Sequence, residues 1–260
     1  MIEFFNIILY EPLFNGLIYL YHTLPGKDIG IAIIVLTIII KLILFLPSLS
    51  AIKSQKALQE VQPKLEELKK KYKDNKEELG RQMMKFYKEN KVSPFSSCLP
   101  LLIQLPILIA LYRVFFGGLT ATDPETGILL GDQLQHLYGY LRDVYTSTPI
   151  NTFFLGFVDM AKNGNYVLAF LAGGLQFWQG RMMMTKRVTT KIPGSKDENK
   201  TTAINRQMMY FMPVITVIFG IQFPAGLTLY WVMSTLFQIA QQHYFFRKKD
   251  SKTEASIVKE

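Results

Sequence analysis

The chain has 260 residues, of which 49% are apolar and only 19% are charged, and its formal net charge is +9. The charged share lies below the roughly 25% that is usual in soluble proteins, and the apolar residues are gathered into long runs. This composition argues against one or two soluble domains and indicates an all-α integral membrane protein with polar loops. The single cysteine, Cys98, excludes an intrachain disulfide and a cysteine-based metal cluster.

Residues 1–29 contain two apolar runs that are separated by Glu11 and Pro12. Neither run is long enough to cross about 30 Å of hydrocarbon. Leucines recur at helical spacing among aromatic residues, at Leu13, Leu17, Leu20 and Leu24. We therefore predict a helix that lies in the interface on the outer side of the membrane. The alternative is a first membrane span of low hydrophobicity.

Residues 30–49 form the first predicted transmembrane helix, because residues 30–47 are apolar or small except for Thr37 and Lys41. An ammonium group is expensive inside a bilayer and tends to mark a pathway, a partner or a water-filled cavity. The simpler alternative is snorkelling. Lys41 lies six residues before Pro47, a helix rise of about 9 Å, so its stem reaches toward the cytoplasmic interface.

Residues 50–91 are rich in lysine and glutamate and predict a cytoplasmic helical hairpin. Apolar residues recur at spacings of three and four in each arm; they are Leu58, Val61, Leu65, Leu68 and Tyr72, and then Leu79, Met83, Phe86 and Tyr87. Residues 73–76 separate the two arms as a turn. Pro63 is expected to kink the first arm or to begin a new segment.

Four further apolar runs predict transmembrane helices at residues 95–117, 166–184, 207–223 and 224–246. Prolines are expected to shape these helices at Pro106, Pro213 and Pro224, and the last joins two spans with almost no loop.

Polar segments connect the predicted spans. We expect an outer loop at residues 118–165, with a surface helix over residues 152–161, and a cytoplasmic loop at residues 185–206. The basic tail, residues 247–260, is expected to be cytoplasmic and disordered.

The charge distribution predicts the orientation of these spans. Residues 1–29 hold one basic and three acidic residues, and residues 117–165 hold two and five. Residues 50–91 hold twelve basic and seven acidic residues, residues 181–206 hold seven and two, and residues 247–260 hold five and three. By the positive-inside rule, the lysine- and arginine-rich segments are cytoplasmic. Five spans follow, with the N-terminus outside and the C-terminus inside.

Four stretches of the sequence, in this order, resemble the YidC family of membrane protein insertases, which has mitochondrial and chloroplast relatives. They are QPKL at 62–65 followed by KYKDNK at 71–76, MKFYKENKVSP at 84–94, CLPLLIQLPI at 98–107, and FMP at 211–213 followed by FPAGLTLYW at 223–231. The resemblance covers most of the chain.

The resemblance implies a bacterial inner-membrane protein that inserts newly made proteins into the bilayer, alone or beside the Sec translocon. It implies five helices around a hydrophilic groove that opens to the cytoplasm, and ribosomes, nascent membrane proteins and lipids as partners. Lys41 matches the family's positive groove residue, which is usually arginine. No nucleotide, cofactor, metal or DNA is expected, and the resemblance implies no enzyme activity.

Polar and aromatic residues of the later spans complete the predicted substrate groove with Lys41; they are Gln104, Gln176, Tyr230 and Trp231. Gln104 and Gln176 offer donors and acceptors without a fixed charge, although interhelical hydrogen bonding is an equally good explanation for both. Trp231 has simple packing as its alternative. No catalytic constellation appears, since the three histidines are scattered.

Three other functional classes compete with insertion. A small-solute transporter would show related halves with helices broken at matching positions, and no such repeat is evident. A channel would need an oligomer and a filter, which a sequence does not reveal. A scaffold that only displays the hairpin would give Lys41 no role.

Overall fold

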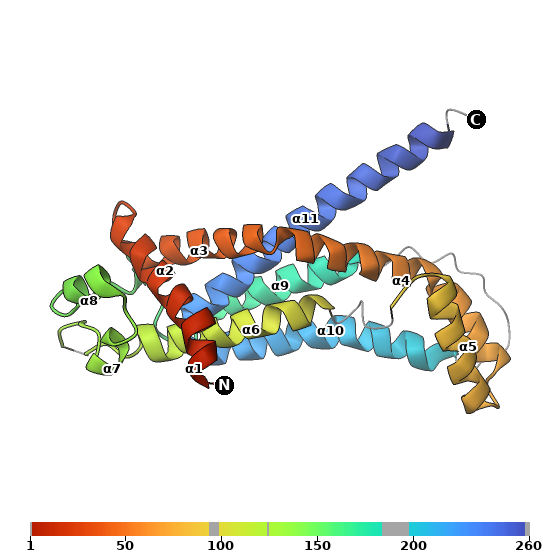
Figure 1. Ribbon diagram of the computed structural model, residues 1–260, viewed down its shortest axis with the longest axis horizontal. Helices are drawn as coiled ribbons and strands as arrows, with labels where there is room; N and C mark the ends of the chain where they lie inside the picture. Colours follow the sequence, from red (N-terminus) through yellow and green to blue (C-terminus); the bar gives the residue numbers. More distant parts are fainter. Residues whose placement is uncertain (1, 94–98, 124, 184–197, 258–260) are drawn as a thin grey trace. The chain divides into compact units, whose positions relative to one another are not determined.

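A computed structural model of the protein describes residues 2–93, 99–123, 125–183 and 198–257 (Figure 1). Helices dominate these residues, and the short strands β1 (Phe153–Phe154) and β2 (Val158–Asp159) form one antiparallel hairpin. The helical elements, in chain order, are α1 Ile2–Phe5, η1 Asn6–Tyr10, α2 Glu11–Thr23, α3 Ile29–Ile43, α4 Phe45–Lys71, α5 Lys76–Glu89, α6 Leu99–Arg113, η3 Val114–Leu119, α7 Gly131–Leu134, α8 Gly139–Tyr145, α9 Tyr166–Met183, α10 Glu198–Gln222 and α11 Ala225–Ile257.

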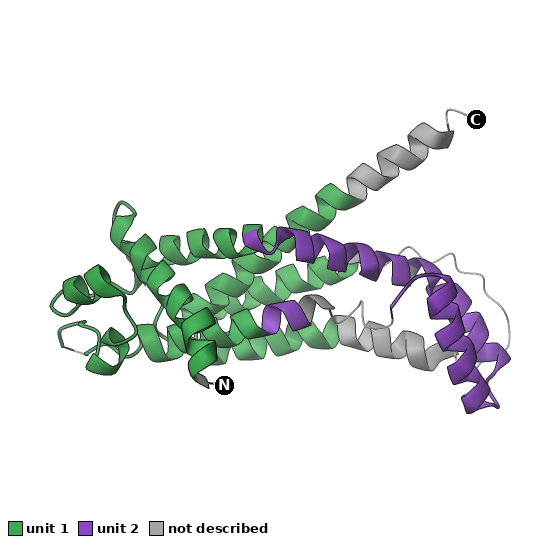
Figure 2. Cartoon of the chain, in the orientation of Figure 1, with its two compact units in different colours: residues 1–42, 106–182, 190–260 green, residues 43–105, 183–189 purple. Residues whose placement is uncertain are grey.

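The chain divides into two compact units (Figure 2). Unit 1 contains residues 1–42, 106–182 and 190–260, and unit 2 contains residues 43–105 and 183–189.

Unit 2 is built on the contact between α4 and α5, which the segment 72–75 connects. Asn75 begins α5, because its side-chain oxygen accepts a hydrogen bond from the backbone N–H of Glu78 at 3.0 Å. The helix α4 continues through Pro63, so the predicted alternative of a new segment at this proline is wrong. The charged side chains of α5 include an exposed ion pair between Arg81 and Glu77.

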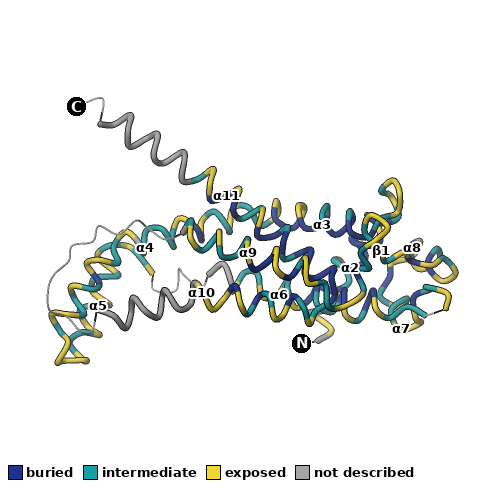
Figure 3. Tube along the Cα trace, turned by 180° about the vertical axis from the view of Figure 1, so that it is seen from behind, coloured by how far each residue is buried: buried dark blue, intermediate teal, exposed yellow. Residues whose placement is uncertain are grey.

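Unit 1 holds most of the buried apolar side chains (Figure 3). Its helices approach closely where glycines leave room. A Cβ at Gly226 of α11 would lie 2.9 Å from Phe115 Cδ1, and a Cβ at Gly173 of α9 would lie 2.5 Å from Val217 Cγ2 of α10. At such contacts the helix backbones pack at the density of a protein interior. An added methyl group at these glycines would therefore clash with the neighbouring helix.

The predicted surface helix over residues 152–161 is wrong, because this segment is the β1–β2 hairpin. Leu155 and Gly156 have φ values of 51° and 79°, which is the conformation of a type I′ hairpin turn. Phe157 N–H closes that turn by donating to the Phe154 carbonyl at 3.2 Å, and the Met160 N–H donates to the Thr152 carbonyl at 2.8 Å. The two positive φ values are incompatible with a continuous α-helix.

The N-terminal segment is helical, as predicted, whereas the C-terminal tail differs from expectation. Helical structure runs from Ile2 to Thr23, and Pro12 is accommodated in the first turn of α2, where a proline costs little. The helix α11 continues to Ile257, so residues 247–257 are helical rather than disordered. This segment contains no glycine or proline that would end a helix. Most of the predicted cytoplasmic loop at 185–206 lies outside the described residues, as does Cys98.

One helical stretch among the described residues, Leu102–Leu119, is long and apolar enough to cross a membrane alone. The segments Ile29–Ile43 and Phe45–Leu58 pass the same test only together, as one bent pair, and Tyr210–Gln222 is apolar but shorter. The count of five spans thus stays a prediction from the sequence pattern.

Candidate functional site

Lys41 lies on the buried face of α3, near the end of this helix. Its side chain is only 4% exposed, and Thr37, one turn earlier, is also buried and donates to the Ile33 carbonyl at 2.6 Å. Ile39, Leu42 and Ile43 of the same helix are exposed instead. A lysine that snorkelled to a wet surface would be more exposed than this. The helix therefore turns its cation toward the interior of the protein, while Ile39, Leu42 and Ile43 face away from it.

The helix α11 carries a row of buried polar side chains on one side. The row consists of Thr228, Ser234, Thr235, Gln241 and Gln242. The Gln242 Oε1 atom has no hydrogen-bond partner in the part of the chain that the structure describes. An unsatisfied buried amide oxygen is costly, which favours a ligand group or water at this position.

Polar side chains also join the neighbouring helices of unit 1. Thr216 of α10 donates a hydrogen bond to Gln176 of α9, and it also donates to the Met212 carbonyl at 3.1 Å. Gln179 of α9 donates to Gln238 of α11 at 2.6 Å. These contacts are the interhelical hydrogen bonds weighed as the alternative role of Gln176.

The two aromatic residues of the predicted groove differ in their surroundings. Tyr230 is 2% exposed and belongs to the core of unit 1, whereas Trp231 is half-buried. The Trp231 carbonyl accepts a hydrogen bond from Thr235 Oγ1 at 2.9 Å. Trp231 is thus the more accessible of the pair.

The structure places four of the five predicted groove residues in unit 1, namely Lys41, Gln176, Tyr230 and Trp231. Gln104 belongs to unit 2, where it is half-buried on α6.

The three predicted structural prolines have different positions. Pro106 and Pro213 lie inside α6 and α10, which both continue past them. The Pro213 carbonyl oxygen would lie 3.0 Å from a Cβ at Gly173, so this part of α10 is in close contact with α9. Pro224 precedes α11, and its carbonyl accepts a hydrogen bond from Leu227 N–H at 3.0 Å.

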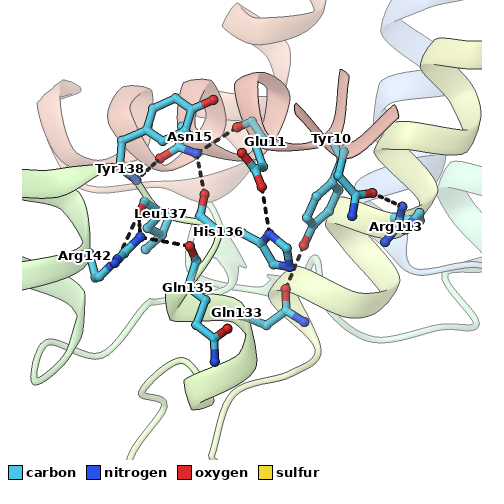
Figure 4. A network of polar contacts seen from close by, with 11 residues as sticks. Tyr10, Glu11, Asn15, Arg113, Gln133, Gln135, His136, Leu137, Tyr138 and Arg142 are labelled. Atoms are coloured by element: carbon cyan, nitrogen blue, oxygen red, sulfur yellow. Dashed lines mark hydrogen bonds and ion pairs between the residues drawn. The ribbon is translucent and has the colours of Figure 1, made fainter. Parts of the chain in front are cut away.

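A polar network that sequence reasoning missed joins the N-terminal helices to the predicted outer loop (Figure 4). The Asn15 amide donates to the His136 carbonyl at 2.7 Å, and its oxygen accepts from the Tyr138 N–H at 2.7 Å. Glu11 Oε1 lies 3.0 Å from His136 Nδ1. These partners are separated by more than 120 positions in the chain, so no local pattern indicates them.

Arg113 of α6 takes part in the same region. It donates to Asn6 Oδ1 at 2.5 Å, and its guanidinium lies 4.9 Å from the centre of the Tyr10 ring. Burial raises the pKa of Tyr10, and the nearby charge of Arg113 opposes that shift. Tyr10 in turn donates to Gln133 at 2.7 Å. The N-terminal helices are thereby tied to both α6 and the predicted outer loop.

A second contact of the same kind involves His22 of α2. Its two ring nitrogens lie 3.3 Å from the Tyr145 hydroxyl and 3.2 Å from the Tyr140 hydroxyl. Burial raises the pKa of Tyr145 to about 12. These contacts hold α2 against α8, so His22 and the two tyrosines have a structural role here.

The row of polar residues on α11 has a signal that sequence reasoning could have used. Thr228, Thr235 and Gln242 recur every seven positions in a helix that is otherwise largely apolar, which places them on one side. Polar residues on one face of a membrane helix indicate a face turned to protein or water.

Comparison with known proteins assigns the chain to a family. The family described as "60Kd inner membrane protein" matches residues 20–252. A membrane protein insertase YidC of Clostridium perfringens is 36% identical over 219 residues, which cover 84% of this chain and 79% of the relative. A protein of the same name from Fusobacterium nucleatum is 33% identical over 221 residues, with 85% and 87% covered.

Other relatives of that name are longer than this chain. The one from Streptomyces avermitilis is 32% identical over 259 residues, and the chain spans 92% of its own length but 58% of that relative. Three more relatives are covered over only 34% to 37% of their length.

Proposed function

The chain belongs to the YidC family of membrane protein insertases, and from this premise we propose that it inserts newly made integral membrane proteins into the bacterial inner membrane and helps them to fold. The observation that carries the proposal is the buried position of Lys41 on the apolar helix α3. A cation is expensive in so apolar a helix and tends to mark a pathway, a partner or a water-filled cavity, which an insertase explains.

The proposed topology has five membrane-spanning helices, with the N-terminus outside and the C-terminus in the cytoplasm. The alternation of lysine- and arginine-rich segments with poor ones supports it. The helix α2 then lies in the outer interface, and the α4–α5 hairpin projects into the cytoplasm.

The proposed mechanism is a hydrophilic groove that opens to the cytoplasm and to lipid. A substrate must carry the polar flank of its helix across hydrocarbon, and each charged residue at the centre costs about 2.5–3.5 kcal/mol. A wet groove that reaches part-way through the bilayer lowers this cost, because the flank keeps its water. Lys41 adds attraction for acidic flanks, while Gln104, Gln176 and the polar row of α11 solvate the flank without fixed charge.

The free energy for transfer comes from the substrate. Its apolar helix leaves water for lipid at a gain of about 25 cal/mol per Å² of buried apolar surface, so no nucleotide is required. Trp231, which is half-buried, offers that helix an apolar side chain along which to slide outward, whereas Tyr230 is buried in the core of unit 1.

Partners follow from the charges outside the spans. The α4–α5 hairpin segment has an excess of five basic residues (twelve minus seven), which suits attraction to ribosomal RNA or anionic lipid. We propose that this hairpin and the basic tail receive nascent chains at the ribosome, and that the protein works alone or with the Sec translocon.

Labelling of cysteine variants tests the groove. In a Cys98→Ser background, Lys41→Cys is compared with Ile39→Cys, which is exposed on another face of α3. A membrane-impermeant maleimide added to the cytoplasmic face of membrane vesicles is expected to modify the thiol at position 41 and spare that at position 39. Equal labelling at both positions, or none at position 41, would count against a groove that opens to the cytoplasm.

A further inference from the structure

The turn of the β1–β2 hairpin presents three large apolar side chains to the surface. Phe153, Leu155 and Phe157 are 41%, 58% and 73% exposed. Leu155 does so with a φ of 51°, a conformation that costs a leucine roughly 1–2 kcal/mol and suits asparagine or glycine better. Exposed turns are ordinarily built from such polar or small residues. A strained leucine between two exposed phenylalanines therefore indicates that this turn meets an apolar environment.

The hairpin is fixed at its tip to the start of α3. Asp28 Oδ1 accepts hydrogen bonds from Gly30 N–H at 2.8 Å and from Ile31 N–H at 3.0 Å, and so caps the helix. The other oxygen, Asp28 Oδ2, accepts from the Leu155 N–H at 2.6 Å. One carboxylate thus connects the tip of the hairpin to the beginning of the first predicted span.

The residue between the exposed phenylalanine and the leucine packs inward. Phe154 fills the space beside Gly30, where a Cβ would lie 2.1 Å from Phe154 Cδ2 and 2.6 Å from Phe154 Cβ. The hairpin therefore rests directly on the backbone of α3. Its alternation of side chains leaves Phe153 and Leu155 facing away.

The base of the hairpin is fixed by three hydrogen bonds to two further helices of unit 1. Met160 and Lys162 accept backbone hydrogen bonds from Gly226 and Ala225 at 2.9 Å each, at the start of α11. The Asn151 N–H donates to the Tyr21 hydroxyl of α2 at 2.8 Å. Fixed at both ends, the turn cannot withdraw its apolar side chains without breaking several of these contacts.

We propose that Phe153, Leu155 and Phe157 form an apolar wedge that enters the outer leaflet of the bilayer at the boundary between headgroups and acyl chains. The depth follows from the hydrogen bond to Asp28, because the residue after it, Ile29, begins α3, the helix that leads into the first predicted span at residues 30–49. The wedge rests on the proposed membrane topology and adds a lipid contact on the side opposite to the cytoplasmic groove.

The chemistry of the wedge favours lipid over a protein partner. Residues 153–157 contain no charged or hydrogen-bonding side chain, so they offer no polar rim for orienting a partner. Three side chains also make a surface far smaller than the roughly 800 Å² that each partner contributes to a stable protein interface. Insertion into an interface needs only apolar area at the right depth.

Spin-label accessibility in proteoliposomes tests the wedge. The purified full chain with Cys98→Ser receives a label at Phe157→Cys, at Ile39→Cys as the lipid-facing control, or at Asp132→Cys as the exposed control in the predicted outer loop. The vesicles contain phosphatidylethanolamine and phosphatidylglycerol. Oxygen, which dissolves in lipid, and a water-soluble nickel chelate are the two relaxation agents.

We expect the label at position 157 to behave like that at position 39, reached by oxygen and shielded from nickel, while the label at position 132 is open to nickel. If positions 157 and 132 behave alike while position 39 is shielded, the wedge does not enter lipid, and a protein partner becomes the better occupant. If position 39 is also open to nickel, the proposed first span fails and the wedge fails with it. A label at Leu155→Cys is measured in parallel, because it reports the depth of the same turn while the Phe157 ring is retained.

Discussion

Replacing Lys41 with glutamate is expected to reduce the insertion of substrates with acidic translocated tails by about tenfold or more, whereas Lys41→Arg is expected to retain insertion. At an effective dielectric constant of about 20, two charges 4 Å apart interact by about 4 kcal/mol, and reversal of one charge turns attraction into repulsion. A tenfold change in rate needs only about 1.4 kcal/mol of that interaction. Insertion is measured as the protease accessibility of the tail in cells or proteoliposomes.

The substrate provides the control for this variant. The same single-span substrate with its acidic residues changed to asparagine and glutamine should be inserted by Lys41→Glu nearly as well as by the parent. A general folding defect would instead lower insertion of both substrates. Equal activity of Lys41→Glu and Lys41→Arg on the acidic substrate would refute the attraction model.

Replacing Gly173 with alanine is expected to lower the free energy of unfolding of the helical core by about 1–3 kcal/mol, the usual cost of overpacking a well-packed interior. The new methyl group would lie 2.5 Å from Val217 Cγ2 and 3.0 Å from the Pro213 carbonyl oxygen. Valine is stiff in a helix and a backbone carbonyl moves only with its helix, so α9 and α10 must separate. Thermal unfolding in detergent measures the loss.

Gly174 provides a matched control one residue away on the same helix. A Cβ at Gly174 would meet no atom within 4 Å. Alanine has a better helix propensity than glycine by about 1 kcal/mol, so Gly174→Ala should leave stability unchanged or raise it. If the two variants unfold at the same temperature, α9 and α10 do not pack as the structure has them.

The helical character of the chain is predictable from the sequence because long apolar runs and amphipathic repeats leave few alternatives. The segment of α9, Tyr166–Met183, was expected at residues 166–184, and its apolar run marks both ends. The β1–β2 hairpin is not predicted, because its residues are apolar and no Asn-Gly or Asp-Gly turn signal separates the two strands. Its turn depends on a positive φ at Leu155, a conformation that a leucine in the sequence does not indicate.

The candidate site is only partly predictable, because many of its contacts join residues that are far apart in the sequence. Lys41 stands out as the cation of an apolar run. Its burial is predictable, because a cation in a membrane helix is expected to face protein or water instead of lipid. Contacts such as Asn15 with His136, or Asp28 with Leu155, join residues more than 120 positions apart, so their partners follow from the fold alone. Arg113 shows the same dependence on the fold, since it contacts Asn6 and Tyr10, which lie far from it in the sequence.

The two ends of the α3 helix bear on different parts of the proposed function. At one end, Asp28 caps the helix and holds the hairpin wedge. At the other, Lys41 is buried within three residues of the end of the helix. A wedge fixed in the outer leaflet would set how deep Lys41 lies in the bilayer. In the proposed mechanism, the depth of Lys41 would in turn set how far a polar flank is drawn in before it loses the cytoplasmic water.

The central proposal, that this chain inserts membrane proteins, is tested most directly by depletion and rescue. The chain is expressed in bacteria whose own insertase has been depleted, and a short-tailed single-span substrate is followed by protease digestion from the outside. We predict that the chain restores cleavage of the translocated tail to the level before depletion, and that Lys41→Glu restores it poorly. A tail that stays protected, although the parent chain is well expressed and present in the membrane, would contradict the insertase function.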